Sequence, residues 1–357
     1  MPQLRSNLTP IIAEAIRLNA ADIILSYGCY PIVKANDKLT PIETFGSLAD
    51  ADIQAMLAEI LPPDKASILE RDRQVDLAYV QGDARFRVNV FYQRTHLTIV
   101  MRYIRAKIRS LDELGLPEIC RELVKNDNGL ILMVGPTGSG KSTSLAAMLD
   151  EINATQGKHI ITIEDPIEYV YDNKSSLIEQ RELGQDATSF AAALRSVLRE
   201  APDTILLGEM RDLESISAAI TVAETGHLVL STIHANTAPG TIDRIIDIFP
   251  DGNKAQIRVQ LADILIAVLN QRLVPQADGS GSKAYIEVMI NTTAVAASIR
   301  SGNTAQLPNI IQTSASEGMV RMDDLLTRAV KRGEITQETA LEYANDRNEV
   351  KKSLMLA

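Results

Sequence analysis

The feature that most constrains the fold of this chain is an apolar run at residues 130–134 that leads directly into the pattern G-x-x-x-x-G-K-S at residues 135–142. Residues 143–153 have a composition compatible with a helix. A strand, a glycine-rich loop and a helix in this order form a phosphate-binding loop. The glycines let the backbone N–H groups face phosphate oxygens, and the helix N-terminus adds partial positive charge. The sequence therefore predicts that the chain binds ATP at this loop.

The residues of the predicted loop have distinct chemical roles. Lys141 is expected to reach the β- and γ-phosphates, and the hydroxyl of Ser142 is expected to be a ligand of Mg²⁺. ATP and Mg²⁺ are therefore the predicted cofactors, with the metal held partly through water. The residues predicted to contact the nucleotide are Gly135, Pro136, Thr137, Gly138, Ser139, Gly140, Lys141, Ser142 and Thr143.

Two further apolar runs lead to carboxylates. Residues 204–207 are followed by Glu209, and the run at 160–164 ends in Glu164, with Glu168 four residues beyond. Acids at the carboxyl ends of parallel strands lie at the edge where open α/β sheets bind ligands. One such acid is as often a helix cap or an ion-pair partner, but two after a phosphate loop favour catalysis. Glu209 is predicted either to hold the Mg²⁺ shell or to polarise the attacking water.

Two of the four histidines flank a single apolar run. His227 precedes residues 228–233 and His234 follows them. The end of this strand places His234 at the same sheet edge as the two predicted acids, where it could sense the γ-phosphate. A single histidine more often has a structural role, and that interpretation is stronger for His227 than for His234. Both are included in the predicted catalytic set.

The apolar runs predict two kinds of sheet. Runs without polar alternation, such as residues 130–134 and 228–233, are typical of parallel strands buried on both faces, with helices as the crossovers. Residues 85–92 instead alternate polar and apolar side chains, which predicts a half-buried antiparallel sheet near the N-terminus. The sequence thus predicts an α/β nucleotide-binding core that follows a smaller α+β unit.

These patterns divide the chain into four parts. We expect an N-terminal domain at residues 1–105, a linker at 106–117, an ATPase core at 118–290 and a C-terminal helical region at 291–357. Within the first domain, helices are predicted near 7–19, 50–60 and 64–72, and strands near 22–27, 31–35, 75–80, 85–92 and 96–104.

Arginines line the polar face of the predicted N-terminal sheet. Arg85 and Arg87 lie on one strand and Arg102 lies on the next. One interpretation is a solvated sheet face. The other is that one of these arginines reaches the nucleotide of a neighbouring subunit and neutralises charge in the transition state. The spacing alone does not decide between them.

Composition limits the partners and the location. The net charge of −10 and the pI of about 5.1 disfavour a protein whose main task is to grip nucleic acid, which needs clustered Lys and Arg. We see no secretory signal and no apolar stretch of the ~18–20 residues that span a bilayer. Cys29 and Cys120 fit no zinc or redox spacing and are expected to be buried, reduced thiols. The predicted location is the cytoplasm, with any membrane attachment made through a partner.

Four ordered motifs resemble those of the secretion-superfamily ATPases. They are the phosphate loop, an Asp box at residues 163–169, a Walker B box at 207–212 and a His box at 226–238. Within this superfamily the sequence is most similar to the retraction ATPases of type IV pili. The resemblance continues at residues 85–89, 101–104 and 270–275, so it covers nearly the whole chain.

This resemblance implies a homohexameric ring. Each subunit would have a PAS-like N-terminal domain, a RecA-like ATPase domain with a parallel-rich sheet, and C-terminal helices. The ring would dock on an inner-membrane platform protein at the pilus base and would power pilus retraction and twitching motility, with a paralogous ATPase as a further candidate partner. Matching residue by residue, Glu209 corresponds to the catalytic glutamate, Glu164 and Glu168 to acids near the metal and the water, and His227 and His234 to the His-box pair.

One C-terminal motif departs from the family pattern. Retraction enzymes carry A-I-R-N-L-I-R-E-G-K, whereas residues 294–303 read A-V-A-A-S-I-R-S-G-N, so that Ala296 and Ala297 replace an arginine and an asparagine. Ala201 likewise stands where the family usually has aspartate. The altered motif supports an alternative, an accessory subunit that binds nucleotide without powering retraction. A pilus assembly or secretion ATPase fits less well, because those relatives are longer and usually carry a four-cysteine zinc module, and a nucleic-acid translocase fits least.

Overall fold

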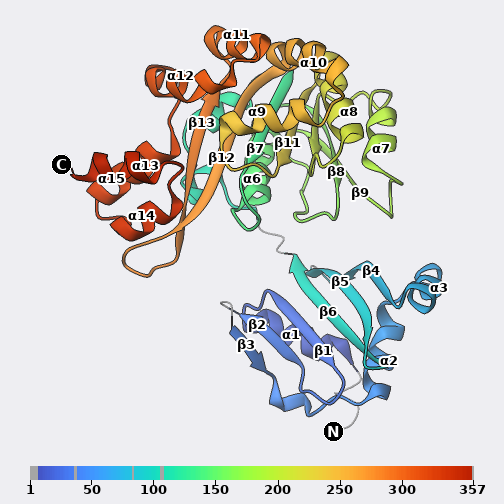
Figure 1. Cartoon of the computed structure of the whole chain (residues 1–357). Coiled ribbons are helices and arrows are strands. Elements are labelled where there is room, and N and C mark those ends of the chain that lie inside the picture. Colours follow the sequence, from blue (N-terminus) through green and yellow to red (C-terminus); the bar gives the residue numbers. More distant parts are fainter. Residues whose placement is uncertain (1–6, 36–37, 83, 105–107, 356–357) are drawn as a thin grey trace. The chain divides into compact units, whose positions relative to one another are not determined.

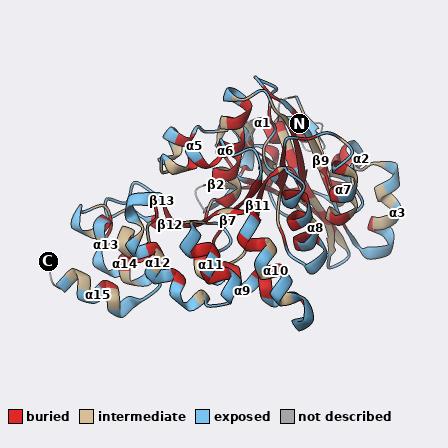
Figure 2. Ribbon diagram, turned by 90° about the horizontal axis from the view of Figure 1, so that it is seen from above, coloured by how far each residue is buried: buried red, intermediate tan, exposed pale blue. Residues whose placement is uncertain are grey.

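The structure, a computed structural model, describes residues 7–35, 38–82, 84–104 and 108–355. The chain forms two compact units, Met1–Lys107 and Ile108–Ala357 (Figure 1). Each unit has its own hydrophobic core, and buried residues follow the strands and the inner faces of the helices (Figure 2). We describe the two units separately.

The first unit is built on a six-stranded, wholly antiparallel sheet in the order β3-β2-β1-β6-β5-β4. This agrees with the α+β architecture expected for the N-terminal part. Its strands are β1 (Asp22–Ser26), β2 (Ile32–Ala35), β3 (Lys38–Pro41), β4 (Gln74–Gln81), β5 (Ala84–Gln93) and β6 (His96–Ile104), and its helices are α1 (Leu8–Arg17), η2 (Glu43–Phe45), α2 (Asp50–Ile60) and α3 (Pro63–Asp72).

Side-chain periodicity explains these elements. In β5, Phe86, Val88 and Val90 are fully buried, while Arg87 on the opposite face is exposed, as the alternation predicted. Helix α1 buries one apolar stripe in the same core, and the side chain of Asn7 caps it by accepting from the N–H of Thr9. Strand β3 was not predicted. All four of its residues are exposed, so its sequence lacks the alternation of buried apolar and exposed polar side chains that marks a half-buried strand.

The second unit is an α/β domain with a seven-stranded sheet in the order β13-β12-β7-β11-β10-β8-β9. All neighbouring pairs are parallel except β12 with β13. The strands are β7 (Gly129–Val134), β8 (His159–Glu164), β9 (Leu177–Glu182), β10 (Thr204–Leu207), β11 (Leu228–Ile233), β12 (Leu265–Pro275) and β13 (Ser282–Ile290). The helices up to β12 are α4 (Leu111–Leu114), α5 (Ile119–Leu123), α6 (Lys141–Thr155), α7 (Phe190–Val197), α8 (Leu213–Glu224), α9 (Ala238–Asp247) and α10 (Asp251–Ile264).

Helices cover both faces of this sheet. In β7, Leu130, Leu132 and Val134 pack into a core shared with α7–α10, whereas Ile131 and Met133 pack into a core shared with α4–α6. Every residue of β7 is therefore buried, which is why its sequence is apolar without alternation. The predicted fold class, an α/β domain with a parallel-rich sheet, is confirmed.

Helices also form the C-terminal region, as expected. They are α11 (Thr293–Ser301), η3 (Thr304–Gln306), α12 (Leu307–Thr313), η4 (Ala315–Glu317), α13 (Met322–Lys331), α14 (Gln337–Tyr343) and α15 (Arg347–Met355). Helices α11 and α12 extend the main core, whereas α13–α15 form a small core of their own on Val274 of β12 and Tyr285 of β13. In the altered motif on α11, Ala296 is buried and Ala297 is exposed.

Some expectations need adjustment. The predicted linker at residues 106–117 includes α4, whose first residue Leu111 is buried in the second unit; residues 106 and 107 lie outside the described residues. Cys120 is buried, but Cys29 is exposed, so the expectation of two buried thiols was wrong for Cys29. Among the described residues, no helix combines the length and apolar character needed to cross a membrane.

Ala201 occupies a backbone conformation that alanine tolerates poorly. Its φ is +52°, in the left-handed region that costs an L-residue about 1–2 kcal/mol. Asparagine adopts this conformation more readily because its short side chain forms local hydrogen bonds. We expect Ala201→Asn to raise the free energy of unfolding by about 0.5–1 kcal/mol in urea denaturation. The exposed helical control Ala154→Asn should lower it; an unchanged or lower value for Ala201→Asn would contradict the assignment of strain.

Candidate functional site

The loop between β7 and α6 has the geometry of a phosphate cradle. Gly135, Gly138 and Gly140 all have positive φ angles, of +144°, +78° and +84°. A Cβ on Gly135 would lie 2.3 Å from the carbonyl oxygen of Gln271, so no other residue fits there. Gly140 caps α6, so the positive end of the helix dipole lies at the loop.

Polar groups inside the loop fit a bound phosphate. Lys141 is only 8% exposed, and its Nζ donates to the carbonyl oxygens of Gly135 and Pro136, both at 2.9 Å. Burial lowers the pKa of Lys141, and the negative charges of Glu209 and Glu168 oppose this shift. The buried hydroxyl of Ser139 has no hydrogen-bond partner among the described residues, so it is available to a ligand.

The two predicted acidic strand ends lie side by side. Gly208 lies just before Glu209, and Ile163 lies just before Glu164. The N–H of Gly208 donates to the carbonyl of Ile163 at 2.8 Å. Strands β8 and β10 are paired in parallel up to this point. The structure therefore brings the Asp-box and Walker B acids together at the edge that carries the phosphate loop.

Glu209 is held between two basic side chains. Its Oε1 lies 3.1 Å from Nε2 of His234, and its Oε2 accepts from Nε of Arg211 at 2.8 Å. The carboxylate is 17% exposed and His234 is 40% exposed, so water and substrate can reach the pair. A carboxylate fixed in this way can orient or polarise a water molecule. Arg211 was not predicted, because an exposed arginine after a strand has no distinctive pattern.

Glu164 lies deeper than Glu209. It is 7% exposed, and its carboxylate accepts from Thr162 at 2.7 Å and from Gln180 at 3.2 Å. Burial raises the pKa of Glu164, and these hydrogen bonds oppose the shift. Glu168 is exposed, and its backbone N–H lies 3.4 Å from Oε2 of Glu164. The Asp box also contacts the start of α6, because Tyr169 and Thr143 share a 2.7 Å hydrogen bond between their hydroxyls.

The raised pKa of Glu164 predicts a pH effect with a definite sign. A carboxyl group whose pKa is higher in the folded state disfavours folding once it ionises, so its contribution to stability falls as pH rises from 4.5 to the folded-state pKa. We expect the free energy of unfolding of wild type, measured relative to Glu164→Gln by urea denaturation, to fall across this window and to level off above it. A difference that rises with pH would contradict the burial argument.

Gln271 of β12 is part of the site although the nucleotide motifs do not include it. Its side chain is 2% exposed, donates to the carbonyl of Ser139 at 2.6 Å and accepts from the hydroxyl of Ser144 at 2.7 Å. One buried amide therefore holds both the phosphate loop and the first turn of α6. The only sequence signal was its place in the family-like stretch at residues 270–275.

Removing this amide should loosen the loop. We expect Gln271→Leu to weaken nucleotide binding about 30-fold, because two hydrogen bonds to the loop and helix, each worth about 1 kcal/mol, are lost. Titration with a fluorescent ADP analogue measures this. The partly exposed control Gln260→Leu, whose amide donates to Glu224 away from the loop, should bind as wild type does. Equal affinities for the two variants would contradict the bracing role of Gln271.

His227 is not brought to this edge of the sheet. It lies at the N-terminal end of β11, with its Nδ1 3.1 Å from the hydroxyl of Thr225 and 3.2 Å from the carbonyl of Val222. The six residues of β11 separate it from His234 by about 20 Å. Within one chain, its contacts are those of a helix-end residue, and its catalytic assignment stays a prediction.

The predicted arginines belong to the first unit. Arg87 and Arg102 are directly opposite each other on β5 and β6. Arg102 is 68% exposed and forms a 2.8 Å ion pair with Asp22, whereas Arg87 is 48% exposed and lies 4.0 Å from Asp76. Arg85 shares their face of the sheet and is less exposed. Arg87 and Arg102 therefore place two exposed positive charges on one face of the sheet.

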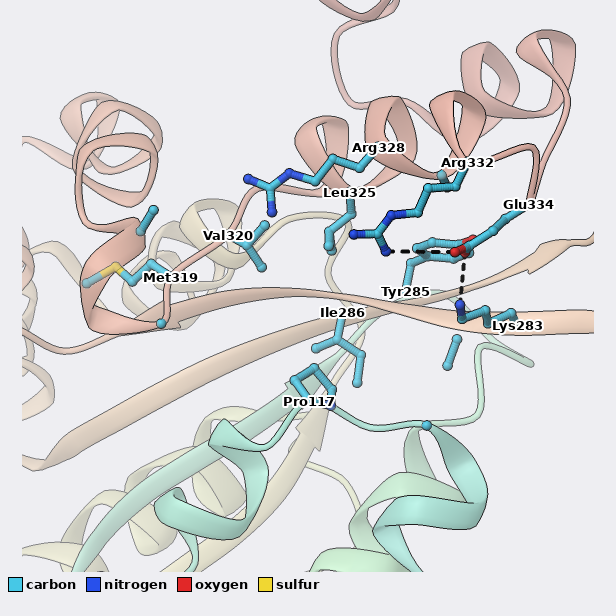
Figure 3. A pocket seen from close by; sticks show the side chains of 15 residues that line it. Pro117, Lys283, Tyr285, Ile286, Met319, Val320, Leu325, Arg328, Arg332 and Glu334 are labelled. Atoms are coloured by element: carbon cyan, nitrogen blue, oxygen red, sulfur yellow. Dashed lines mark hydrogen bonds and ion pairs between the residues drawn. The ribbon is translucent and has the colours of Figure 1, made fainter.

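Cavities adjoin the phosphate loop on two sides. One of about 300 Å³ is lined by Arg109, Gly140, Thr143 and Leu273 among others, and one of about 450 Å³ lies between residues 136–139 and the end of α14. A third cavity, of about 380 Å³, lies away from the loop between β13 and α13 (Figure 3). There Glu334 binds Lys283 and the hydroxyl of Tyr285, both at 2.9 Å.

Comparisons with known proteins show which family this chain resembles. The family model described as "Type II/IV secretion system protein" matches residues 6–355. The type IV pilus retraction ATPase PilT of Pseudomonas aeruginosa is 42% identical over 95% of this chain and 98% of its own length. A twitching motility protein of Neisseria gonorrhoeae is 40% identical over 96% of this chain and 91% of its own length.

A solved structure extends the likeness to three dimensions. The structure of the pilus retraction motor PilT with bound ADP superposes with a TM-score of 0.91 at 44% identity, covering 96% of this chain and 98% of that one. The family match over residues 6–355 spans both units, the phosphate loop and the C-terminal helices. The chain therefore belongs to the type II/IV secretion system protein family.

Proposed function

We propose that this chain is a motor ATPase that hydrolyses ATP to power the retraction of type IV pili. The observation that carries the proposal is the Glu209 carboxylate, held by His234 and Arg211 at the sheet edge beside the phosphate loop. The relatives named PilT and twitching motility protein support pilus retraction as the process that ATP hydrolysis drives.

In this mechanism the loop binds the phosphates and Glu209 acts on water. Lys141 exchanges its two carbonyl partners for phosphate oxygens and neutralises their charge. Glu209 orients and polarises the attacking water, and His234, in contact with Glu209, responds to the presence of the γ-phosphate. Glu164 and Glu168, at and after the end of the neighbouring strand β8, add two further carboxylates to this edge of the sheet.

Ser142 and Glu209 would hold Mg²⁺, partly through water. Among the described residues, no group of three or more His, Cys, Asp or Glu side chains is arranged to bind a metal ion. In a nucleotide site Mg²⁺ keeps several waters and takes its other ligands from phosphates and one or two side chains. The ion would neutralise charge on the β- and γ-phosphates.

The working assembly in this proposal is a homohexameric ring in the cytoplasm, docked on an inner-membrane platform protein at the pilus base. An arginine of the first unit, Arg85, Arg87 or Arg102, would act on the nucleotide of a neighbouring subunit. Mixing tests this: rings assembled from Glu209→Gln subunits and subunits that carry Arg85→Ala, Arg87→Ala or Arg102→Ala should recover ATPase activity only if the arginine acts between subunits. No recovery for any pair would contradict this part of the proposal.

The altered motif on α11 keeps one alternative open, an accessory subunit that binds nucleotide without powering retraction, with a paralogous ATPase as the motor. In this chain Arg300 of the motif forms an ion pair with Asp263. Deletion of the gene separates the possibilities. Abundant pili with lost twitching support the retraction motor, unchanged twitching supports the accessory role, and absent pili would indicate an assembly ATPase.

A further inference from the structure

Three consecutive residues of β12 connect the two halves of the nucleotide site. Gln271 faces the phosphate loop, as described above, while its neighbours point to the opposite face of the strand. There Asn270 and Arg272 both donate to the backbone carbonyl of Asn236, each at 3.0 Å. Asn236 lies two residues after His234, so β12 touches both the phosphate loop and the segment that carries the predicted sensor.

Arg272 also reaches the C-terminal helices. Its guanidinium donates to the backbone carbonyl of Tyr343, the last residue of α14, and to the side-chain oxygen of Asn345. The end of α14 faces the outer side of the phosphate loop across the cavity of about 450 Å³ that Arg272 helps to line. Burial lowers the pKa of Arg272, and the charges of Glu287 and Asp323 oppose the shift. An arginine stays protonated in such a site, so all of its guanidinium N–H groups remain hydrogen-bond donors.

Glu287 of β13 makes a second connection between the same two regions. It is 3% exposed, and one carboxylate oxygen accepts from the N–H of Ala238 at 2.8 Å and from Asn270 at 3.0 Å. The other oxygen accepts from the N–H of Met322, the first residue of α13, at 3.4 Å. The segment of residues 234–238 and the C-terminal helices are thus joined through side chains of β12 and β13.

The C-terminal helices are in turn tied to one another. Asp323 of α13 accepts from the N–H groups of Asn345 and Asp346, at 2.7 and 2.9 Å, and Arg321 binds Glu349 of α15 at 2.6 Å. Glu334, just after α13, is fixed on β13 by Lys283 and Tyr285 (Figure 3). A displacement applied at Tyr343 or Met322 would therefore move α13–α15 together.

We propose that Arg272 is a positioning residue that couples the segment of residues 234–238 to helices α13–α15, so that the state of the nucleotide is passed to the C-terminal helices. The coupling rests on the proposed function, since it needs a nucleotide that acts on His234. Arg272 holds Asn236 and Tyr343 at the same time, and a shift of either changes the strain on the other.

The test compares Arg272→Met with the matched control Arg321→Met. Arg321 binds Asp324 and Glu349 within the C-terminal helices, and among the described residues it forms no hydrogen bond or ion pair with the segment of residues 234–238. Amide hydrogen exchange of residues 322–355 is measured with and without ADP, together with ADP affinity and steady-state ATP hydrolysis. In wild type, ADP should change exchange in α13–α15.

We expect Arg272→Met to bind ADP within about threefold of wild type, to lose the ADP-dependent exchange difference and to lower kcat about 10-fold with little change in KM. Arg321→Met should exchange faster with and without ADP but keep the difference. Arg272→Lys keeps the charge and one donor group, and it should recover part of the difference; it also serves as the test if Arg272→Met does not fold.

Three outcomes would overturn the coupling. The first is a wild-type exchange difference retained in Arg272→Met. The second is that Arg272→Met loses ADP affinity together with the exchange difference, which would make Arg272 a nucleotide-binding residue. The third is no ADP-dependent difference in wild type. Failure of the proposed function is a separate result, in which wild type binds ADP and shows the difference but does not hydrolyse ATP.

Discussion

Replacing Lys141 with alanine is expected to weaken nucleotide binding by about 100-fold or more and to abolish measurable ATP hydrolysis. The Lys141 Nζ lies inside the loop, bound to the carbonyl oxygens of Gly135 and Pro136, where a phosphate oxygen would be its next partner. No other basic side chain is in the described part of the loop at residues 135–142. Titration with a fluorescent ADP analogue and a coupled ATPase assay measure both effects.

A matched lysine controls for loss of charge. Lys125 is exposed and pairs only with Glu122 on the surface, so Lys125→Ala should bind and hydrolyse ATP as wild type does. If Lys141→Ala kept its affinity within a few-fold of Lys125→Ala, the loop would not be the phosphate site. Thermal unfolding of both variants confirms that the fold is retained.

Replacing Glu209 with glutamine is expected to lower kcat about 1,000-fold while nucleotide affinity stays within about threefold of wild type. Glutamine keeps the size of the side chain and an oxygen for Arg211, but it cannot act as a base or polarise water as a carboxylate does. The split between lost turnover and retained binding is the sign of a group that acts in the chemical step. Steady-state kinetics and titration with the ADP analogue give the two numbers.

Glu214 supplies the control for this variant. It lies in the first turn of α8, is exposed and pairs with Arg195, so Glu214→Gln should keep wild-type kcat. If the kcat of Glu209→Gln were close to that of Glu214→Gln, Glu209 would have no part in the chemical step. Glu164 or Glu168 would then have to act on the attacking water instead.

The parts of the fold that were predictable have strong local signals. Strand β7 is buried on both faces, so its sequence is apolar throughout and predicts the strand. The loop after it contains three glycines with positive φ, and their spacing in the sequence predicts the loop. His234 follows a buried strand, and parallel pairing brings that strand end to the one that carries Glu209. Strand β3 carries no such signal, since its residues are all exposed.

The residues that sequence reasoning missed act across long distances in the chain. Gln271 braces the carbonyl of Ser139, 132 residues earlier, and Arg272 reaches Tyr343, 71 residues later. A buried amide or a partly buried guanidinium within an apolar strand looks like an interruption of the pattern until the pairing of β12 with β7 places it beside the loop. Only the order of strands in the sheet reveals what these side chains contact.

The two histidines illustrate the same limit. His227 and His234 flank one strand and look equivalent in the sequence, but β11 carries them to opposite edges of the sheet. Contact with Glu209 distinguishes His234. The arginines of the first unit are a different case, because their predicted target lies on another subunit and no property of a single chain decides which of them acts.

The central claim, that ATP hydrolysis by this chain pulls pili back, is tested most directly in living cells. Pili are labelled and filmed in cells whose only copy of the gene carries Glu209→Gln, beside cells that carry Glu214→Gln. The account predicts pili that extend but no longer retract in the first strain and normal retraction in the second. Retraction at the wild-type rate in cells that carry Glu209→Gln would contradict it.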